Sequence, residues 1–221
     1  MFRVITVARE YGSGGAAVAR RVAELLGWSL LDGSLVGVVA RRAQVDIEMA
    51  RRYDESVDSW WRRFHRAGIW SAAVDAGVSP AEAELFDAET MAAYTHEVIQ
   101  EAALKGNCVI VGRGAQCVLR DSPEAFHVFV YGSWPERIAR ARERFGQVRD
   151  AASVLRSFDR TRAACIRRYF KCDWKDPHLY HMMISSQPGI GNVASMVVSA
   201  VCDSESPAAS AWYRTIRYPR N

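Results

Sequence analysis

The chain has 221 residues, of which 49% are apolar, and a formal net charge of +4. This length suits one domain with a sizeable core, and the composition is that of a globular protein rather than a disordered or fibrous one. No run of about 18 apolar residues is present, and residues 1–10 lack a signal-peptide core and cleavage site, so we expect a cytoplasmic protein without a membrane span.

The first predicted elements are a strand, a glycine turn and a helix. Val4–Val7 is a short apolar run rich in β-branched residues, which is typical of a buried strand. A helix is expected over residues 15–26, and Gly27 ends it as a C-terminal glycine does. The apolar face of this helix consists of Val18, Val22, Leu25 and Leu26. Trp28–Leu31 is a second short strand that ends at Asp32.

The middle of the chain is predicted to be helical before it returns to a strand. Residues 34–78 have an irregular helical pattern with paired arginines, and Ser79–Glu84 has the Ser-Pro start and early acids of a helix N-terminus. The next helix has an apolar face made by Met91, Tyr94, Val98 and Ala102. Cys108–Val111 is then a continuous apolar strand that runs directly into Gly112-Arg113-Gly114.

The second half of the chain repeats this alternation. His127–Tyr131 is predicted to be a strand, and it is followed by Gly132-Ser133 and by a helix that begins near Pro135. A long arginine-rich helix is expected over about residues 151–171, and a last strand over His181–Ser185. The final helix has an apolar face made by Ile190, Val193, Val197 and Val201. The tail from residue 203 onward has no clear period.

Apolar strands that alternate with amphipathic helices predict an α/β fold with a parallel sheet covered on both faces. In such sheets, ligands bind beyond the C-terminal ends of the strands. Three of the predicted strand ends carry glycine and polar residues: Arg9–Gly15, Gly112–Gly114 and Gly132-Ser133. The pattern therefore places a ligand site where these three segments meet.

The basic residues of the chain are concentrated in one segment and are mostly arginine. Residues 137–171 contain eleven basic residues and three acids. Arginine presents a planar fork that matches phosphate oxygens in pairs. This segment is either a solvated helical face or a cover over a polyanionic ligand. No nucleic-acid-binding module accompanies it, so nucleic acid is not the expected partner.

The five cysteines are widely spaced, without a C-x-x-C pair, and the five histidines show no metal-ligand spacing. Neither a disulfide framework nor a zinc site is therefore expected, and the thiols are interpreted as buried or incidental.

The glycine turn after the first strand matches two kinds of phosphate-binding loop, besides an ordinary strand–helix turn. Gly12-x-Gly14-x-x-Ala17 satisfies the dinucleotide fingerprint, with Asp32 twenty residues after Gly12, where a ribose-binding acid would lie. A dinucleotide turn, however, has its first glycine at the end of the strand, and four residues separate Val7 from Gly12.

A loop of this length fits the P-loop pattern G-x-x-x-x-G-K-[ST], in which backbone N–H groups surround a phosphate. Gly14 takes the place of the second glycine and Arg9 that of the first. Gly15 replaces the lysine, and Ala16 (or Ala17, in the variant with one more residue) replaces the hydroxyl that binds Mg²⁺. The cradle is kept, while the cation and the metal-binding hydroxyl are absent from their usual positions.

Five segments together resemble the cytidylate kinase-like proteins, which are P-loop relatives of the nucleoside monophosphate kinases. These segments are ITVAREYGSGG, LLDGSLV, VIVGRGAQCVLRD, HVFVYGSWPERIARARERF and KCDWKDPHLYHMMISS, and the similarity covers about residues 3–201. The resemblance implies a P-loop kinase-like domain over residues 1–202, with a helical acceptor-binding insertion at about 34–90, an arginine-rich lid at about 137–175, and a tail at 203–221. It also implies that ATP binds at the first strand and its loop, and the acceptor after Asp32 and around Arg113.

The sequence departs from that family at several positions. Ala16 stands where the cytidylate kinase-like branch has an arginine beside its glycine, and Gly114 stands where true cytidylate kinases have the aspartate of G-R-D. Val36-Gly37 replaces a Tyr-Arg pair of the acceptor segment. Cytosine specificity is therefore the part of the resemblance with the least support.

The leading hypothesis is ATP-dependent phosphorylation of a nucleoside monophosphate such as CMP, with ATP and Mg²⁺ as cofactors and no metal site built from protein side chains. The alternatives are a degenerate kinase that only binds nucleotides and a dinucleotide-dependent oxidoreductase. The candidate residues are Arg9, Arg140 and Arg144 for catalysis; Arg9, Gly12, Ser13, Gly14 and Gly15 for the nucleotide; Asp32 and Arg113 for the acceptor; and Arg137, Arg160 and Arg162 in the lid. Asp32 or Asp159 would hold Mg²⁺ through water. The sequence leaves the oligomeric state open.

Overall fold

The computed structural model describes residues 1–32, 88–145 and 150–203. The predictions for residues 34–78, for Ser79–Glu84 and for the tail lie outside these ranges. The insertion expected at about 34–90 falls almost wholly outside them as well.

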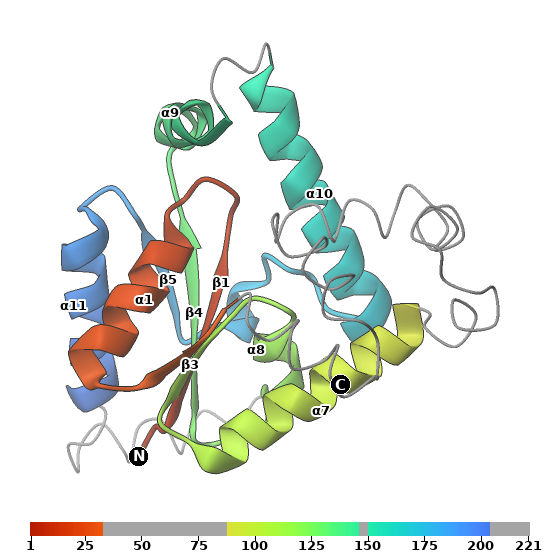
Figure 1. Ribbon diagram of the computed structural model, residues 1–221, viewed down its shortest axis with the longest axis vertical. Helices are drawn as coiled ribbons and strands as arrows, with labels where there is room; N and C mark the ends of the chain where they lie inside the picture. The colour runs from red at the N-terminus through yellow and green to blue at the C-terminus, as the bar shows by residue number, and fades with distance from the viewer. Residues whose placement is uncertain (33–87, 146–149, 204–221) are drawn as a thin grey trace, which may run out of the picture.

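The described strands form one parallel sheet in the order β2-β3-β1-β4-β5 (Figure 1). They are β1 (Val4–Arg9), β2 (Ser29–Leu31), β3 (Cys108–Val111), β4 (Ala125–Tyr131) and β5 (Met182–Ser185). The predicted strands are all present, and the parallel arrangement is confirmed. Since every strand points the same way, their C-terminal ends share one edge of the sheet, as the sequence pattern requires.

Strand β1 is two residues longer than predicted. The register pairs Ala8 with Phe129 and Arg9 with Val130, so hydrogen bonding to β4 continues past Val7. The prediction that Arg9 belongs to the loop is therefore wrong, because Arg9 is the last residue of the strand. The connecting loop comprises residues 10–14.

Six helices and one short 3₁₀ turn accompany the sheet in the described ranges. They are α1 (Gly15–Leu26), α7 (Ala88–Lys105), α8 (Ala115–Val118), α9 (Trp134–Phe145), α10 (Ala151–Phe170), α11 (Ile190–Asp203) and the turn Pro177–Leu179. Gly27 caps α1 in the left-handed conformation, as predicted. Asp150 caps α10 by accepting a hydrogen bond from the backbone N–H of Ser153. The single-turn helix α8 was not predicted.

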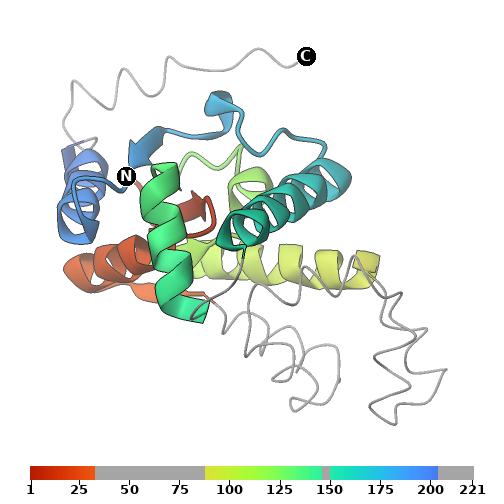
Figure 2. The same ribbon diagram turned by 90° about the horizontal axis from the view of Figure 1, so that it is seen from above.

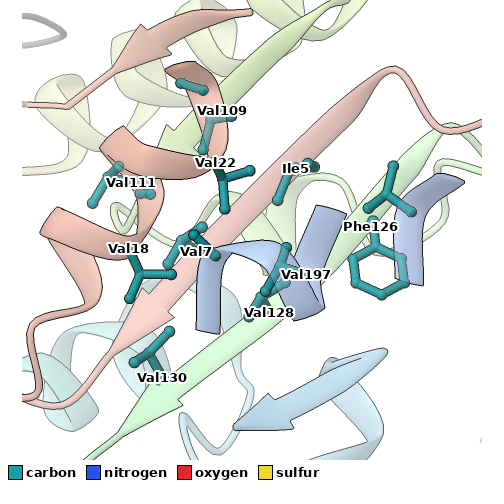
Figure 3. Packing of buried hydrophobic residues seen from close by; sticks show 14 of the residues in the cluster. Ile5, Val7, Val18, Val22, Val109, Val111, Phe126, Val128, Val130 and Val197 are labelled. Carbon is teal, nitrogen blue, oxygen red and sulfur yellow. The ribbon is translucent and has the colours of Figure 1, made fainter. Parts of the chain in front are cut away.

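Helices α1 and α11 cover one face of the sheet and build the main core (Figure 3). Val18 and Val22 of α1 and Val197 of α11 are fully buried against the strands. Each such side chain contributes about 1.5–3 kcal/mol by leaving water. Leu25 is an exception to the predicted apolar stripe, because it is 43% exposed near the end of α1.

Helices α7 and α8 cover the opposite face, where Val98 and Ile99 pack against Ile110. Helix α9 lies beyond the C-terminal edge of the sheet, with α10 beside it (Figures 1 and 2). The chain returns from α10 through Trp174, which is buried against Phe129 of β4. The two arginine-rich helices therefore stand next to the loop between β1 and α1.

In the described part of the chain, none of the helices combines the length and the hydropathy that crossing a bilayer requires.

Candidate functional site

The loop between β1 and α1 is a tight glycine turn. Gly12 and Gly14 have φ values of 75° and 81°, in the left-handed region that favours glycine. A Cβ atom on Gly12 would lie 2.8 Å from the carbonyl oxygen of Arg137, and one on Gly14 would lie 2.8 Å from Cδ1 of Ile190. The buried Ser13 hydroxyl donates to the carbonyl oxygen of Glu10 at 2.9 Å. Both the backbone conformation and the close neighbours thus require glycine here.

This loop leaves several backbone N–H groups without a protein acceptor. Within residues 1–32, 88–145 and 150–203, no acceptor meets the N–H groups of Gly12, Gly14, Ala16 and Ala17. The last two belong to the first turn of α1, whose N-terminus carries a partial positive charge. Such a group of donors at a helix N-terminus suits an anion, and phosphate is the usual one.

The side chain of Arg9 crosses from the end of β1 to the end of β3. A Cβ atom on Gly15 would lie 2.5 Å from Cβ of Arg9, and one on Gly112 would lie 2.0 Å from its Nη1 atom. The stem of Arg9 therefore occupies the space beside Gly15, the position at which a P-loop carries its lysine. Its charge is displaced from the loop toward the turn after β3.

That turn, Gly112-Arg113-Gly114, has three consecutive residues with positive φ, at 71°, 59° and 72°. Two glycines accept this conformation easily, but for Arg113 it is strained, and such strain is concentrated at functional sites. A Cβ on Gly114 would lie 2.3 Å from the ring of Phe170. The space beside these two glycines is therefore filled by Arg9 and Phe170 of the chain itself.

Asp32 follows β2 at the edge strand of the sheet, next to β3 and two strands away from β1. In the dinucleotide-binding fold, the second strand lies directly beside the first, so that its terminal acid reaches the ligand. Here β3 separates β1 from β2. This order argues against the dinucleotide hypothesis and places Asp32 beside the Arg113 turn.

Three lid arginines contact carbonyl oxygens of the loop and of the strand end. Arg137 donates from Nε to the carbonyl oxygen of Tyr11 at 2.7 Å, and Arg140 donates to that of Gly12 at 3.2 Å. Arg162 donates to the carbonyl oxygen of Arg9 at 2.7 Å. The sequence predicted these side chains near the loop, and the structure adds that they are bonded to the loop itself.

The other candidate residues are less involved. Arg144 lies in α9 with its side chain outside the described part of the structure, and Arg160 is exposed on α10. The carboxylate of Asp159 pairs with Arg137 and accepts the backbone N–H of Tyr11, so it is not available for a metal ion.

Sequence reasoning missed two participants in the site. Glu10 is buried, and its carboxylate pairs with Arg137 at 3.1 Å and with Lys175 at 2.5 Å. An acidic residue inside a loop expected to bind phosphate was the signal for Glu10. Nothing in the local sequence pointed to Lys175, which comes from the segment after α10.

Comparison with known proteins gives a family and a fold. A family model described as the cytidylate kinase-like family matches residues 4–188. No curated protein sequence gives a significant match.

Solved structures resemble the chain over nearly its whole length. An uncharacterized protein from Eubacterium ventriosum is 22% identical, with a TM-score of 0.64 over 90% of this chain and 98% of that one. A gluconokinase from Sinorhizobium meliloti is 13% identical, with a TM-score of 0.53 over 97% of both chains. A shikimate kinase from Acinetobacter baumannii, solved with shikimate, is 16% identical, with a TM-score of 0.52 over 93% of this chain and 96% of that one.

These likenesses show that the sheet and its helices form the P-loop kinase fold. The family match covers the loop at the start of α1, the Arg113 turn and both lid helices. The chain belongs to the cytidylate kinase-like family.

Proposed function

We propose that this protein transfers a phosphoryl group from ATP to a nucleoside monophosphate such as CMP, in the cytoplasm. The observation that carries the proposal is the path of Arg9, from the glycine loop to the turn that holds Arg113. A single cation thereby lies between the segment suited to the phosphates of ATP and the segment suited to the acceptor. Phosphoryl transfer depends mainly on such positioning and on neutralising charge.

In this mechanism the N–H groups of Gly12, Gly14, Ala16 and Ala17 bind the phosphates of ATP, and the guanidinium of Arg9 offsets the charge that develops on the transferred group. Arg113 holds the phosphate of the acceptor. When bound with ATP, Mg²⁺ would add further charge neutralisation.

The described residues fit Mg²⁺ only as a partner of the phosphates. They contain no group of three or more His, Cys, Asp or Glu side chains able to bind a metal ion, and Ala16 and Ala17 supply no hydroxyl. Asp32, half-exposed at the edge of the sheet, is the carboxylate that would hold the ion through water.

A coupled ATP-consumption assay with CMP, dCMP, UMP and AMP, each with and without Mg²⁺, tests the proposal. We expect slow turnover with at least one acceptor, and its loss in Arg9→Ala. The matched control is Arg21→Ala, because Arg21 is an exposed arginine on α1 that pairs with Glu24 of the same helix. Turnover that survives in Arg9→Ala would show that another cation neutralises the charge on the transferred group.

A second candidate function is nucleotide binding without catalysis. It is favoured by the absence of the P-loop lysine and metal-binding hydroxyl, and by the three lid arginines that are bonded to backbone carbonyl oxygens. Binding of ATP or ADP in calorimetry without turnover of any of the four acceptors would support this candidate over the first.

A further inference from the structure

Arg137 is buried in the lid–loop contact and uses all three of its nitrogen atoms within the protein. The residue is 4% exposed. Nη1 lies 3.1 Å from the carboxylate of Glu10, Nη2 pairs with Asp159, and Nε donates to the carbonyl oxygen of Tyr11. All three nitrogen atoms of this guanidinium therefore already have protein partners, two of which are carboxylates, and the side chain is almost wholly buried.

Tyr11 is held from three directions by residues of the lid. Its N–H donates to Asp159 at 2.9 Å, and its carbonyl oxygen accepts from Arg137 at 2.7 Å. Its ring stacks on that of Phe158, with the centroids 4.2 Å apart and the planes 12° from parallel. The orientation of this residue in the loop is therefore set by α9 and α10 together.

The fixed carbonyl of Tyr11 also fixes the next N–H group. In a trans peptide, the C=O of one residue and the N–H of the next point in opposite directions. Because Arg137 holds the carbonyl oxygen of Tyr11, the N–H of Gly12 points away from Arg137. That N–H is one of the loop donors that no acceptor meets in the described part of the chain.

The other two lid arginines do not have this effect. Arg140 holds the carbonyl oxygen of Gly12, but the following N–H, that of Ser13, is already bonded to the carbonyl oxygen of Glu10. Arg162 holds the carbonyl oxygen of Arg9, and the following N–H, that of Glu10, is bonded to Val130. Of these three arginine contacts, the one made by Arg137 orients an N–H group that no acceptor meets within the described residues.

We propose that Arg137 is a positioning residue that orients the N–H of Gly12 toward the phosphates of the nucleotide without touching them itself. The proposal rests on the proposed function only in taking a nucleotide phosphate as the ligand of the loop. It assigns Arg137 a role that differs from that of a lid arginine reaching into the site, because its effect passes through one peptide group.

The test is the binding of ATP, ADP and adenosine to the full chain, measured by calorimetry for the wild type, Arg137→Met and Arg137→Lys. Arg137→Met keeps most of the stem and removes the guanidinium. We expect it to weaken ATP and ADP by the same factor, on the order of tenfold to a hundredfold, and to leave adenosine unchanged. Arg137→Lys should restore part of the loss, since it returns a donor and a charge.

Four outcomes would overturn the proposal. A larger loss for ATP than for ADP would mean that Arg137 contacts the terminal phosphate directly. An equal loss for adenosine would mean that the variant only disturbs the fold. Unchanged binding of all three ligands to Arg137→Met would mean that Arg137 does not orient the loop. A wild type that binds neither ATP nor ADP would mean that the loop does not bind nucleotide phosphates. A wild type that binds ADP but shows no turnover would instead overturn the proposed kinase activity alone.

Arg142→Gln is the matched control, because Arg142 lies exposed on the same helix, and this variant should bind like the wild type. If Arg137→Met does not fold, Asp159→Asn provides the second variant. Its amide oxygen can still accept the N–H of Tyr11, while the ion pair with Arg137 is lost. We expect a smaller loss for ATP and ADP in equal measure, again with adenosine unchanged; unchanged ADP binding here would count against the proposal.

Discussion

The face of the sheet under α1 and α11 and the edge of the sheet under α9 and α10 are held together in different ways. On the face, Val18, Val22 and Val197 meet an apolar surface of strand residues. At the edge, Glu10, Asp159 and Arg137 form an ionic network around the loop, with an apolar contact between Tyr11 and Phe158 beside it. The free energy gained by burying apolar surface depends little on the orientation of the groups, whereas that of hydrogen bonds and hydrogen-bonded ion pairs depends on it strongly.

This difference indicates which part of the molecule sets stability and which part sets the shape of the site. The apolar face should carry most of the free energy of folding. The ionic edge contributes less net free energy, because the cost of removing charges from water offsets much of their attraction. What the edge supplies is the orientation of individual peptide groups in the loop.

The largest effect should come from the apolar face. Phe126 is 1% exposed in the main core, and Phe126→Ala should lower the free energy of unfolding by about 3–5 kcal/mol. Urea denaturation followed by circular dichroism measures this change. Leu104→Ala, at a side chain that is 82% exposed, is the control and should change little. Similar losses in the two variants would mean that the apolar face does not dominate stability.

At the edge, we expect a substitution to change ligand binding more than it changes stability. Arg113→Gly removes the proposed contact with the acceptor phosphate, and CMP binding should weaken by roughly 1.5–3 kcal/mol, or ten- to a hundredfold. The same change relieves the positive φ of 59°, which should offset part of the free energy of unfolding lost with the contacts of the side chain. Calorimetry with CMP and urea denaturation give the two values. Normal CMP binding would refute the role of Arg113.

Acid should weaken the sheet itself. The pKa of His127 is lowered to about 3, mainly by burial and secondly by the nearby His181. The Thr6 hydroxyl hydrogen-bonds Nδ1 at 2.8 Å, and Nε2 donates to the carbonyl oxygen of Leu119 at 3.2 Å, so the neutral ring is satisfied. The unfolded chain takes up the proton first, near its ordinary pKa of about 6.5. The stabilisation is therefore complete above that pH and is lost as the pH falls toward 3.

Because of His127, the free energy of unfolding should be about 2 kcal/mol lower at pH 5 than at pH 7. Urea denaturation at the two pH values measures it, and His127→Gln separates it from other titrations because glutamine cannot take up the proton. If the variant showed the same loss between pH 7 and pH 5 as the wild type, His127 would not be the cause.

The smallest effect compares two glycines with similar backbone conformations. Gly112 and Gly27 have φ values of 71° and 65°, so an alanine at either position should cost about 1–2 kcal/mol of stability. A Cβ on Gly112 would also meet Nη1 of Arg9, whereas nothing lies within 4 Å of one on Gly27. Only Gly112→Ala should therefore displace Arg9 and reduce turnover in the ATP-consumption assay. Equal turnover in the two variants would show that the path of Arg9 does not matter.

The sequence alone determined most of the described elements of the fold, apart from α8 and the end of β1, and it also located the loop. The valines of α1 and α11, the cap at Gly27 and the run Cys108–Val111 follow local periodicity, which reflects the geometry of a helix or strand and requires no knowledge of distant residues. The glycine turn after β1 was found in the same way. These predictions hold in the structure, and the family match agrees with the resemblance carried by the motifs.

The tertiary structure alone decided what the charged side chains do. Whether Arg9 belongs to the strand depended on pairing with β4, and whether Gly112 leaves space depended on where Arg9 points. Arg137 contacts the carbonyl oxygen of Tyr11, which is 126 residues away in the chain. An arginine has a long stem with many rotamers, so its partner is selected by the groups that the folded backbone brings within reach, and local sequence contains no record of them.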